Sequence, residues 1–424
     1  MKMSRTRKRA RFTSLCLLAA LLAPLIFAAS LAHAQSGKLD GQFRDWLEND
    51  LWPQASAKGV SRQTFDSAFA GVKLNLDLPD LVRPGEKPKV ADKQHQAEFS
   101  SPANYFSEKT IAAIVSGGKA RAGEHGRALK AAEKKFGVPA SIILAIWGRE
   151  SGFGKNQGKY PAFEVLGTKA FMSTRKDLFN KEVLAALVIV EKGLATPEMM
   201  KVSWAGAMGQ PQFLPSSYLD HAIDFDGDGR ADIWNSAPDT IASIANYLKN
   251  FGWQAGRGWG AEAVVPENVS CALEGPDQGK PLGDWTSAGL ARADGKAFAK
   301  GEAGKEQFLM APAGRNGPMF LATANFYVIK NYNISDLYAL FIGHAADRIN
   351  GGKAGFAAPW GKVSGLSRGN IAAMQERLVA MGYDVGKADG LPGFKTRRSI
   401  GDWQAKNGLA ATCFPDAGLK KVLK

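Results

Sequence analysis

One carboxylic acid stands at the end of an apolar helix face, where it could act as a general acid. Residues 138–150 read VPASIILAIWGRE, and Pro139 suits the first turn of a helix. Ile146 and Trp147 lie on the helix face that Glu150 shares. Apolar surroundings raise the pKa of a carboxyl group and keep it protonated near neutral pH. The pattern therefore indicates Glu150 as a proton donor, although a solvent-facing glutamate at a helix end would also fit it.

A second group of acids has the spacing of a calcium-binding loop. Positions 1, 3, 5, 7 and 9 of an EF-hand loop are matched by Asp224, Asp226, Asp228, Arg230 and Asp232. Arg230 would bind through its carbonyl oxygen. Asn235 stands where the loop needs a bidentate glutamate, and Asp239 could replace it in a longer loop. The sequence predicts a weak structural Ca²⁺ site within residues 224–239 rather than a solvated acidic turn.

Segments with a helical pattern must position Glu150 and the acidic loop. A segment of different composition interrupts these helical segments. Residues 104–255 are strongly helical in pattern, whereas glycine, proline and short apolar pieces alternate over residues 256–316. A helical pattern returns at residues 320–349. We expect an α+β, predominantly helical fold in which a catalytic domain of residues 35–352 carries a small β-rich insert.

The last 60 residues read as a separate small helical domain. Glycines in residues 353–364 indicate a linker, and residues 365–424 follow it. Leu378 belongs to an apolar helix face that ends before Gly382, and Trp403 lies on a second helix. We expect either a binding domain or a helical cap that stabilises the enzyme.

The first 34 residues have the layout of a secretory signal peptide. Six basic residues precede an apolar run from Leu15 to Leu31, and Ala32-His33-Ala34 suits the cleavage site. Pro24 interrupts the run, which argues against a membrane anchor. We expect cleavage after Ala34, location in the periplasm and no stable membrane insertion afterwards.

Charge and cysteine content limit the partners. The net charge is +14, and it is +8 without the six cations of the signal peptide. No basic block interleaved with aromatic residues follows, so nucleic acid is excluded and an anionic wall polymer fits better. The periplasm permits a disulfide, but Cys271 and Cys413 lie far apart in sequence, so we expect two free, buried thiols.

Three ordered runs resemble motifs of the membrane-bound lytic transglycosylase B family. They are IWGRESGFG at 146–154, SWAGAMGQPQFLPSSY at 203–218 and NYNISDLYAL at 331–340. The resemblance covers roughly residues 40–350. The C-terminal pattern of Met381-Gly382-Tyr383, the turn at 389–390 and Trp403-Gln404 resembles the small helical peptidoglycan-binding domain of wall enzymes.

The resemblance implies a lysozyme-like catalytic domain with one acid, at the position of Glu150. The residues that would contact the sugars are Ser203, Gln212, Tyr247, Tyr332, Tyr338 and, without a clear motif around it, Tyr105. Calcium loops also occur in this family, and no organic cofactor is implied. The expected reaction cleaves the bond between N-acetylmuramic acid (MurNAc) and N-acetylglucosamine (GlcNAc) in peptidoglycan strands and leaves 1,6-anhydro ends.

Two alternatives stay open at this point. A hydrolytic muramidase would need a second carboxylate, for which Glu164 and Asp220 are candidates outside any motif. The second alternative is a non-catalytic scaffold that binds the cell wall. The presence of Glu150, Ser203 and Gln212 argues against this alternative.

Overall fold

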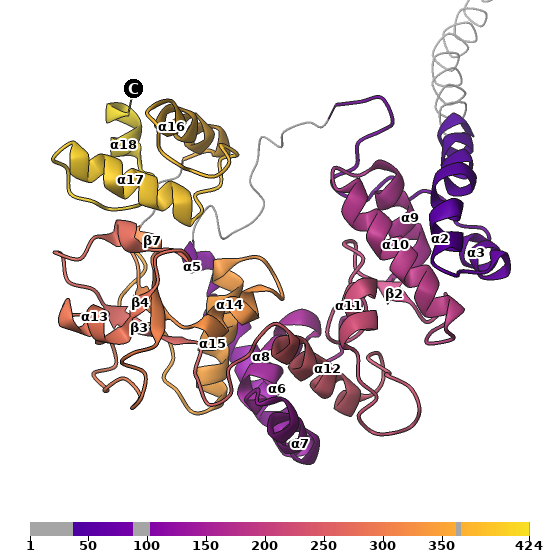
Figure 1. Ribbon diagram of the computed structural model, residues 1–424, viewed down its shortest axis with the longest axis horizontal. Coiled ribbons are helices and arrows are strands. Elements are labelled where there is room, and N and C mark those ends of the chain that lie inside the picture. Colours follow the sequence, from indigo (N-terminus) through magenta and orange to yellow (C-terminus); the bar gives the residue numbers. More distant parts are fainter. Residues whose placement is uncertain (1–36, 88–101, 362–365, 424) are drawn as a thin grey trace, which may run out of the picture. The chain divides into compact units, whose positions relative to one another are not determined.

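The computed structural model describes residues 37–87, 102–361 and 366–423, which form mostly helices, with a two-stranded and a five-stranded sheet (Figure 1). The predicted signal peptide lies outside these residues. The chain divides into two compact units. Of the described residues, the first unit combines 37–87 and 159–207, and the second combines 102–158, 208–361 and 366–423.

The first unit is helical. Its elements are a helix over 37–46, η1 (Leu47–Leu51), α2 (Trp52–Ala57), α3 (Arg62–Phe69), α9 (Ala162–Met172), α10 (Lys176–Glu191) and the paired strands β1 (Tyr160–Pro161) and β2 (Lys201–Val202). The Ser61 side chain accepts from the backbone N–H of Thr64 and so begins α3. Phe43 and Phe69 approach Gly167 closely, which brings the N-terminal helices onto α9.

The helices of the second unit surround α8, which carries Glu150. They are α5 (Pro102–Tyr105), α6 (Glu108–Glu124), α7 (Gly126–Phe136), α8 (Ala140–Ser151), α11 (Pro215–His221), α12 (Ala237–Asn250), α14 (Ala324–Lys330) and α15 (Asp336–Ile349). Every residue of 141–148 is buried, because α6, α7, α12 and α15 all pack against α8. Gly152 ends α8 in the left-handed conformation at φ 60°.

The β-rich insert is a five-stranded sheet of order β4-β6-β8-β3-β5, in which all neighbours are antiparallel. The strands are β3 (Gly260–Val264), β4 (Lys280–Pro281), β5 (Ala291–Arg292), β6 (Glu306–Met310) and β8 (Met319–Ala322), with β7 (Pro312–Arg315), α13 (Leu282–Ser287) and η2 (Cys271–Leu273) between them. The helix expected from Phe320 is wrong at its start, since Phe320 pairs with Glu262 in the sheet. Helix α14 begins only after Thr323 caps it.

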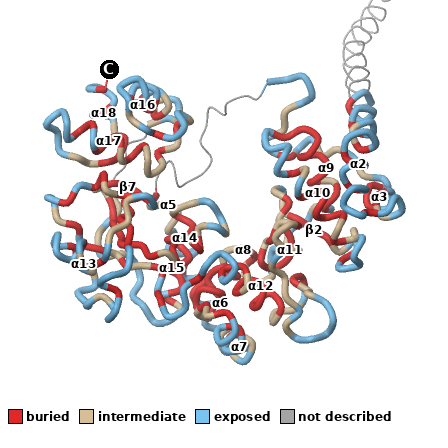
Figure 2. The backbone as a smooth tube through the Cα atoms, in the orientation of Figure 1, coloured by how far each residue is buried: buried red, intermediate tan, exposed pale blue. Residues whose placement is uncertain are grey.

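The C-terminal domain contains α16 (Arg368–Ala380), α17 (Phe394–Lys406) and α18 (Ala417–Val422). Its own core is buried (Figure 2) and consists of Met374, Leu378, Val385, Ile400, Trp403, Leu419 and Leu423. The sequence therefore identified this helical domain correctly.

The two cysteines form a disulfide, so the expectation of free thiols is wrong. Cys271 of η2 and Cys413 lie 142 residues apart in sequence, yet their Cα atoms are 6.1 Å apart. Helix α17 packs against η2, and a Cβ atom at Gly401 would lie 2.3 Å from the Cys413 sulfur. A glycine at position 401 thus leaves room for the bond, which links the β-rich insert to the C-terminal domain.

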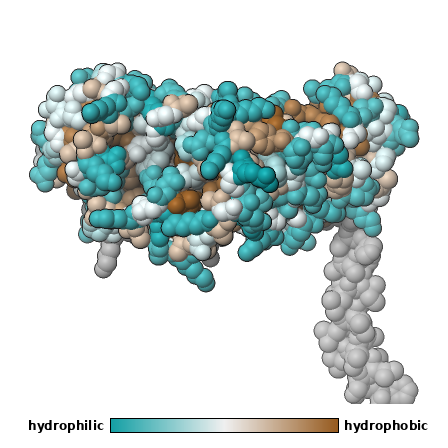
Figure 3. Space-filling view, turned by 90° about the horizontal axis from the view of Figure 1, so that it is seen from below, coloured by the Kyte–Doolittle hydropathy of each residue, from teal (hydrophilic) through white to brown (hydrophobic). Residues whose placement is uncertain are grey.

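Hydrophilic side chains cover most of the face drawn in Figure 3, and they interrupt the apolar areas. Trp204, Val264 and Ile334 are among the exposed large apolar residues. Within the described ranges, no helix has the length and apolar character needed to cross a membrane.

Candidate active site

Helix α8 presents Glu150 to a tyrosine of α15. The Tyr338 hydroxyl donates a hydrogen bond of 2.6 Å to Oε1 of Glu150. Burial raises the pKa of Glu150 to about 7, although the Tyr338 hydrogen bond and the Arg149 charge both lower it. A substantial fraction of Glu150 is therefore protonated at neutral pH, as a general acid requires.

A buried hydrogen-bond chain fixes the helix face one turn before Glu150. The Trp147 indole donates to Oε1 of Gln210 at 2.9 Å, and the Gln210 amide donates to the carbonyl of Trp234 at 3.1 Å. A Cβ at Gly154 would lie 2.6 Å from the same Gln210 oxygen, so the glycine permits this close packing. Sequence reasoning missed Gln210, although it lies within the run at 203–218.

Three of the predicted tyrosines lie together beside Glu150. Tyr332 stacks on Tyr338 with ring centroids 6.4 Å apart, and Tyr247 lies 4.7 Å from Tyr332. The Tyr247 hydroxyl donates to the Asn331 carbonyl, and burial together with the Glu150 charge raises the pKa of Tyr247 to about 12. Tyr338 is 1% exposed and Tyr247 is 7% exposed, so Tyr332, which is half-buried, is the most accessible residue of the three.

Tyr105 lies next to the acid through Arg149. The Arg149 guanidinium is 4.8 Å from the Tyr105 ring centroid and 4.6 Å from that of Phe341. Because Arg149 precedes Glu150, this stacking holds a positive charge near the carboxyl group. The structure thus brings Tyr105 close to the site through the side chain of Arg149.

The predicted polar residues fall in different units. Gln212 belongs to the second unit, has φ 53°, and donates to the carbonyl oxygens of Gly209 and Gln157. Ser203 belongs to the first unit, where its Oγ accepts from the N–H groups of Ala205 and Ala207. Both side chains stabilise turns of the 203–218 run, and their contact with sugar stays a prediction.

Glu164 and Asp220, the candidates for the second carboxylate of a hydrolase, have contacts that differ from those of Glu150. Glu164 on α9 accepts a hydrogen bond of 2.7 Å from Asn75 within the first unit. Asp220 is exposed on α11, where its charge acts on His221. The hydrogen bonds of Glu150 and the charges that act on it involve Tyr338 and Arg149 instead.

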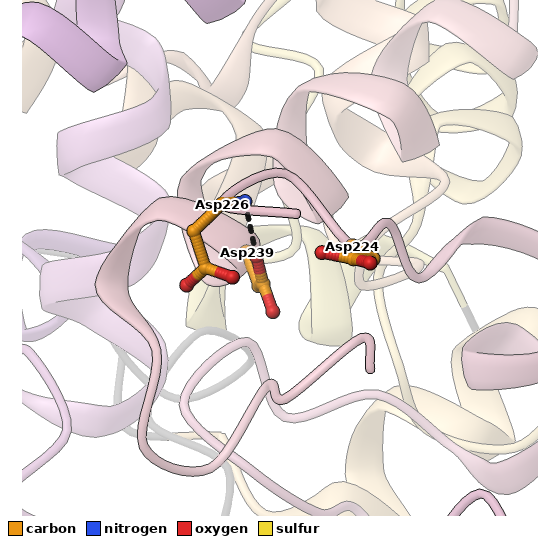
Figure 4. Close-up of side chains that lie close together, drawn as sticks. All are labelled: Asp224, Asp226 and Asp239. Carbon is orange, nitrogen blue, oxygen red and sulfur yellow. Dashed lines mark hydrogen bonds between the residues drawn. The ribbon is translucent and has the colours of Figure 1, made fainter. Parts of the chain in front are cut away.

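Three aspartates meet at the predicted calcium loop (Figure 4). Asp224, Asp226 and Asp239 offer carboxylate oxygens within 4.8 Å of one another. Asp239 is fully buried at the start of α12 and accepts from the backbone N–H groups of Phe225 and Asp232. Carboxylate oxygens are the ligands that Ca²⁺ prefers, so the donor set fits this ion.

The other loop positions lie outside this triad. The Asp228 side chain accepts from the N–H of Arg230, and the Arg230 carbonyl accepts from the N–H of Asp232. Asn235 donates its amide to Asp232. Asp239 rather than Asn235 therefore supplies the acid that follows the loop, and the roles of Asp228 and Arg230 as ligands stay predictions.

A mainly helical fold with a protonatable acid among tyrosines is typical of enzymes that cleave glycan chains. The family model described as "Transglycosylase SLT domain" matches residues 42–347, and "Putative peptidoglycan binding domain" matches residues 367–423. The chain is 30% identical over 266 residues to membrane-bound lytic murein transglycosylase B of Escherichia coli (strain K12), which covers 62% of this chain and 68% of that protein. The chain belongs to this family of lytic transglycosylases.

Solved structures agree with this assignment. SltB3 from Pseudomonas aeruginosa is 35% identical, and the match covers 90% of this chain and 99% of that one. The TM-score is 0.75 for its complex with NAG-anhNAM-pentapeptide and 0.77 for its complex with NAG-NAM-pentapeptide. Escherichia coli Slt35 in complex with calcium shares the fold at 24% identity and a TM-score of 0.57, covering 72% of this chain and 94% of that one.

Proposed function

We propose that this lytic transglycosylase uses Glu150 first as an acid and then as a base on peptidoglycan. Protonated Glu150 donates its proton to the glycosidic oxygen between MurNAc and GlcNAc, and the bond from that oxygen to C1 of MurNAc breaks. The C6 hydroxyl of the same MurNAc then bonds to C1 and returns its proton to Glu150. The products are a GlcNAc hydroxyl and a 1,6-anhydro ring, and no water is consumed.

The contact between Tyr338 and Glu150 is the observation that carries this proposal. A pKa of about 7 leaves Glu150 able to donate and accept a proton within one turnover. The hydroxyl of Tyr338 can donate to the carboxylate that remains after the first proton transfer. The C6 hydroxyl is tethered near C1, so its attack has the entropic advantage of an intramolecular reaction.

Tyr332, which is partly exposed, would contact the sugar, with Tyr105 as a further candidate. Tyr247 holds the Asn331 carbonyl, and Gln212 and Ser203 shape the turns of the 203–218 run. We infer that these three act mainly by fixing the backbone around them and by offering polar atoms to the substrate.

Mass spectrometry of muropeptides released from purified sacculi tests the reaction. Anhydro ends would make each product one water lighter than the corresponding product of a hydrolase. Products that carry that water would identify a muramidase and would direct attention to Glu164 and Asp220. The matched control is Glu150→Gln, which should release neither product.

The C-terminal domain would hold the enzyme on the wall. The match of residues 367–423 to a peptidoglycan-binding domain supports this role. The SltB3 complexes with NAG-NAM-pentapeptide and NAG-anhNAM-pentapeptide make strands with stem peptides the expected substrate and anhydro fragments the expected product. Tethering raises the effective concentration of the enzyme at its polymer.

Asp224, Asp226 and Asp239 would hold a calcium ion. The ion would offset two of the three negative charges and tie the loop to α12, which packs on α8. Weak binding suffices outside the cytoplasm, where such sites have dissociation constants of about 10⁻⁴–10⁻³ M.

The periplasm is the compartment that fits best. The N-terminal pattern predicts export, and the Cys271–Cys413 disulfide supports an oxidising environment. Fractionation of cells that express the protein, with determination of the mature N-terminus, tests cleavage after Ala34.

A further inference from the structure

The C-terminal domain docks on the catalytic domain through a buried arginine. Arg397 of α17 is 5% exposed, and its Nε and Nη2 lie 2.8 Å and 2.9 Å from the two carboxylate oxygens of Glu274. Glu274 follows η2 in the β-rich insert and is 1% exposed. The two bidentate hydrogen bonds offset the free-energy cost of removing both charges from water. Removal of one partner would leave the other charge buried and unpaired.

Arg397 also reaches the helix that carries Tyr338. Its Nη2 lies 3.7 Å from Oδ2 of Asp336, the first residue of α15. The other oxygen of Asp336 is 2.7 Å from the ammonium of Lys330 on α14. The carboxylate of Asp336 is therefore held between one cation of the C-terminal domain and one of the catalytic domain.

The first turn of α15 connects Asp336 to the acid. Ser335 caps this turn by accepting from the N–H of Tyr338, two residues after Asp336. The Tyr338 hydroxyl then donates to Glu150. Since a capped helical turn is rigid, a displacement of Asp336 would move the Tyr338 hydroxyl as well.

We propose that Arg397 is a positioning residue for the reaction: it fixes Asp336 and thereby holds the Tyr338 hydroxyl on Glu150. The inference rests on the proposed role of Glu150. It gives the C-terminal domain a second task beside wall binding, because an intact active site requires α17 in its docked position.

A neighbouring ion pair provides the matched control. Arg398 of the same helix binds Asp277 at the rim of the interface, with 2.5 Å between Nη2 and Oδ1. The Asp277 side chain is 55% exposed, and Arg398 also donates to the backbone carbonyl of Glu274. Among the described residues, these bonds of Arg398 go to Asp277 and Glu274 and not to α15. Arg398→Gln therefore removes an ion pair of the same interface, whereas Arg397 keeps its contacts with the Glu274 carboxylate and with Asp336, so the C-terminal domain should stay docked.

The test measures kcat and KM on a soluble muropeptide strand across a pH series. The double variant Glu274→Gln with Arg397→Gln removes both buried charges together, and the disulfide keeps the C-terminal domain attached. A second variant, Asp336→Asn, leaves the Arg397–Glu274 pair intact and serves if the double variant fails to fold. Arg397→Lys keeps the charge and should recover part of the activity.

We expect kcat to fall by about 10- to 10²-fold in the double variant and in Asp336→Asn, the cost of a displacement of about 1 Å at a reacting centre. The groups that act on Glu150 are Arg149 of its own helix and Tyr338, with Tyr332 and Tyr247 facing its charge. A loosened Tyr338 hydrogen bond should move the alkaline limb of the pH profile to higher pH, as Tyr338→Phe should. Arg398→Gln should leave kcat and the limb unchanged.

The inference would be overturned if the variant Glu274→Gln with Arg397→Gln folds and has the same kcat, and the same alkaline limb of its pH profile, as the unaltered enzyme. A loss confined to binding on insoluble sacculi would overturn it too, because wall binding alone explains that result. Glu150→Gln in the same assay separates the two proposals. If Glu150→Gln stays active, the proposed function fails; if it is inactive while the Arg397 variants are normal, only this inference fails.

Discussion

Tyr338 and Glu150 are 188 residues apart in sequence, and the tyrosine hydroxyl lies 2.6 Å from Oε1 of the glutamate. The contact joins α15 to the end of α8, two helices that pack along each other. A donor at this position stabilises the ionised carboxylate, whereas burial stabilises the neutral form. The balance between them places the pKa of Glu150 near neutrality.

Replacement of Glu150 by glutamine should abolish catalysis. The amide keeps the size of the side chain but cannot transfer a proton, so we expect a loss of at least about 10²–10⁴-fold. Clearing of purified sacculi and release of muropeptides measure the effect. Glu267→Gln, at an exposed position of the β-rich insert, is the control that should retain full activity. Near-normal digestion by Glu150→Gln would remove Glu150 from the mechanism.

The same variant should change how stability depends on pH. Because the folded pKa of Glu150 is about 7, above the value near 4.5 of a free glutamate, the folded state binds more protons between these pH values. Stability is therefore lost as pH rises through this window. Glu150→Gln lacks the titrating group, so its melting temperature should exceed that of the unaltered protein by more at about pH 8 than at about pH 5. An equal difference at both pH values would contradict the raised pKa.

Removal of the tyrosine hydroxyl should alter the pH profile in a defined direction. In Tyr338→Phe the Glu150 carboxylate loses a donor, so its pKa rises further and the alkaline limb of kcat moves to higher pH. We also expect kcat to fall, because the ionised intermediate loses a charge-assisted hydrogen bond. Tyr383→Phe in the C-terminal domain is the matched control. A limb that moves to lower pH would show that the hydroxyl does not stabilise the carboxylate.

Periodicity predicted the parts of the fold and site that are local in sequence. The apolar face of α8, the glycine at its end and the helices of the C-terminal domain follow from residues within one or two turns. The pattern singled out Glu150 because its acid ends an apolar stripe, and its catalytic role stays a prediction. The pattern failed at Phe320, where a buried strand and a buried helix look alike over a few residues.

Contacts between distant segments could not be predicted in this way. The disulfide and the Arg397–Glu274 pair each depend on how α17 docks, and local spacing carries no information on docking. Gln210 is a similar case, since its partner Trp147 lies 63 residues away. Motif resemblance predicted Tyr338 to be a site residue, but only the structure shows that it donates to the acid.

Calcium should stabilise the protein through the triad of Asp224, Asp226 and Asp239. With a dissociation constant of about 10⁻⁴–10⁻³ M, about 10 mM calcium would add roughly 1.4–2.7 kcal/mol to the free energy of unfolding. Melting curves with calcium and with chelator measure it. Asp226→Asn should reduce the difference, whereas Asp45→Asn, an exposed change in the first unit, should preserve it. Identical midpoints with and without calcium would exclude the site.

Loss of the disulfide should destabilise the C-terminal domain together with the β-rich insert. The bond closes a segment of 142 residues, and removal of such a cross-link typically costs about 2–5 kcal/mol because the unfolded chain gains freedom. We expect Cys271→Ala with Cys413→Ala to melt at a lower temperature than the oxidised protein. Both sulfurs are fully buried, so a substitution by alanine avoids leaving a polar group there.

A reducing agent separates the cross-link from the packing of the side chains. It should lower the melting temperature of the unaltered protein toward that of the double alanine variant and leave the variant itself unchanged. Because the Arg397–Glu274 pair persists after reduction, the domain should stay docked at moderate temperature and activity on soluble strands should be retained. Equal melting temperatures for the oxidised and reduced protein would show that docking, rather than the covalent bond, holds α17 against the insert.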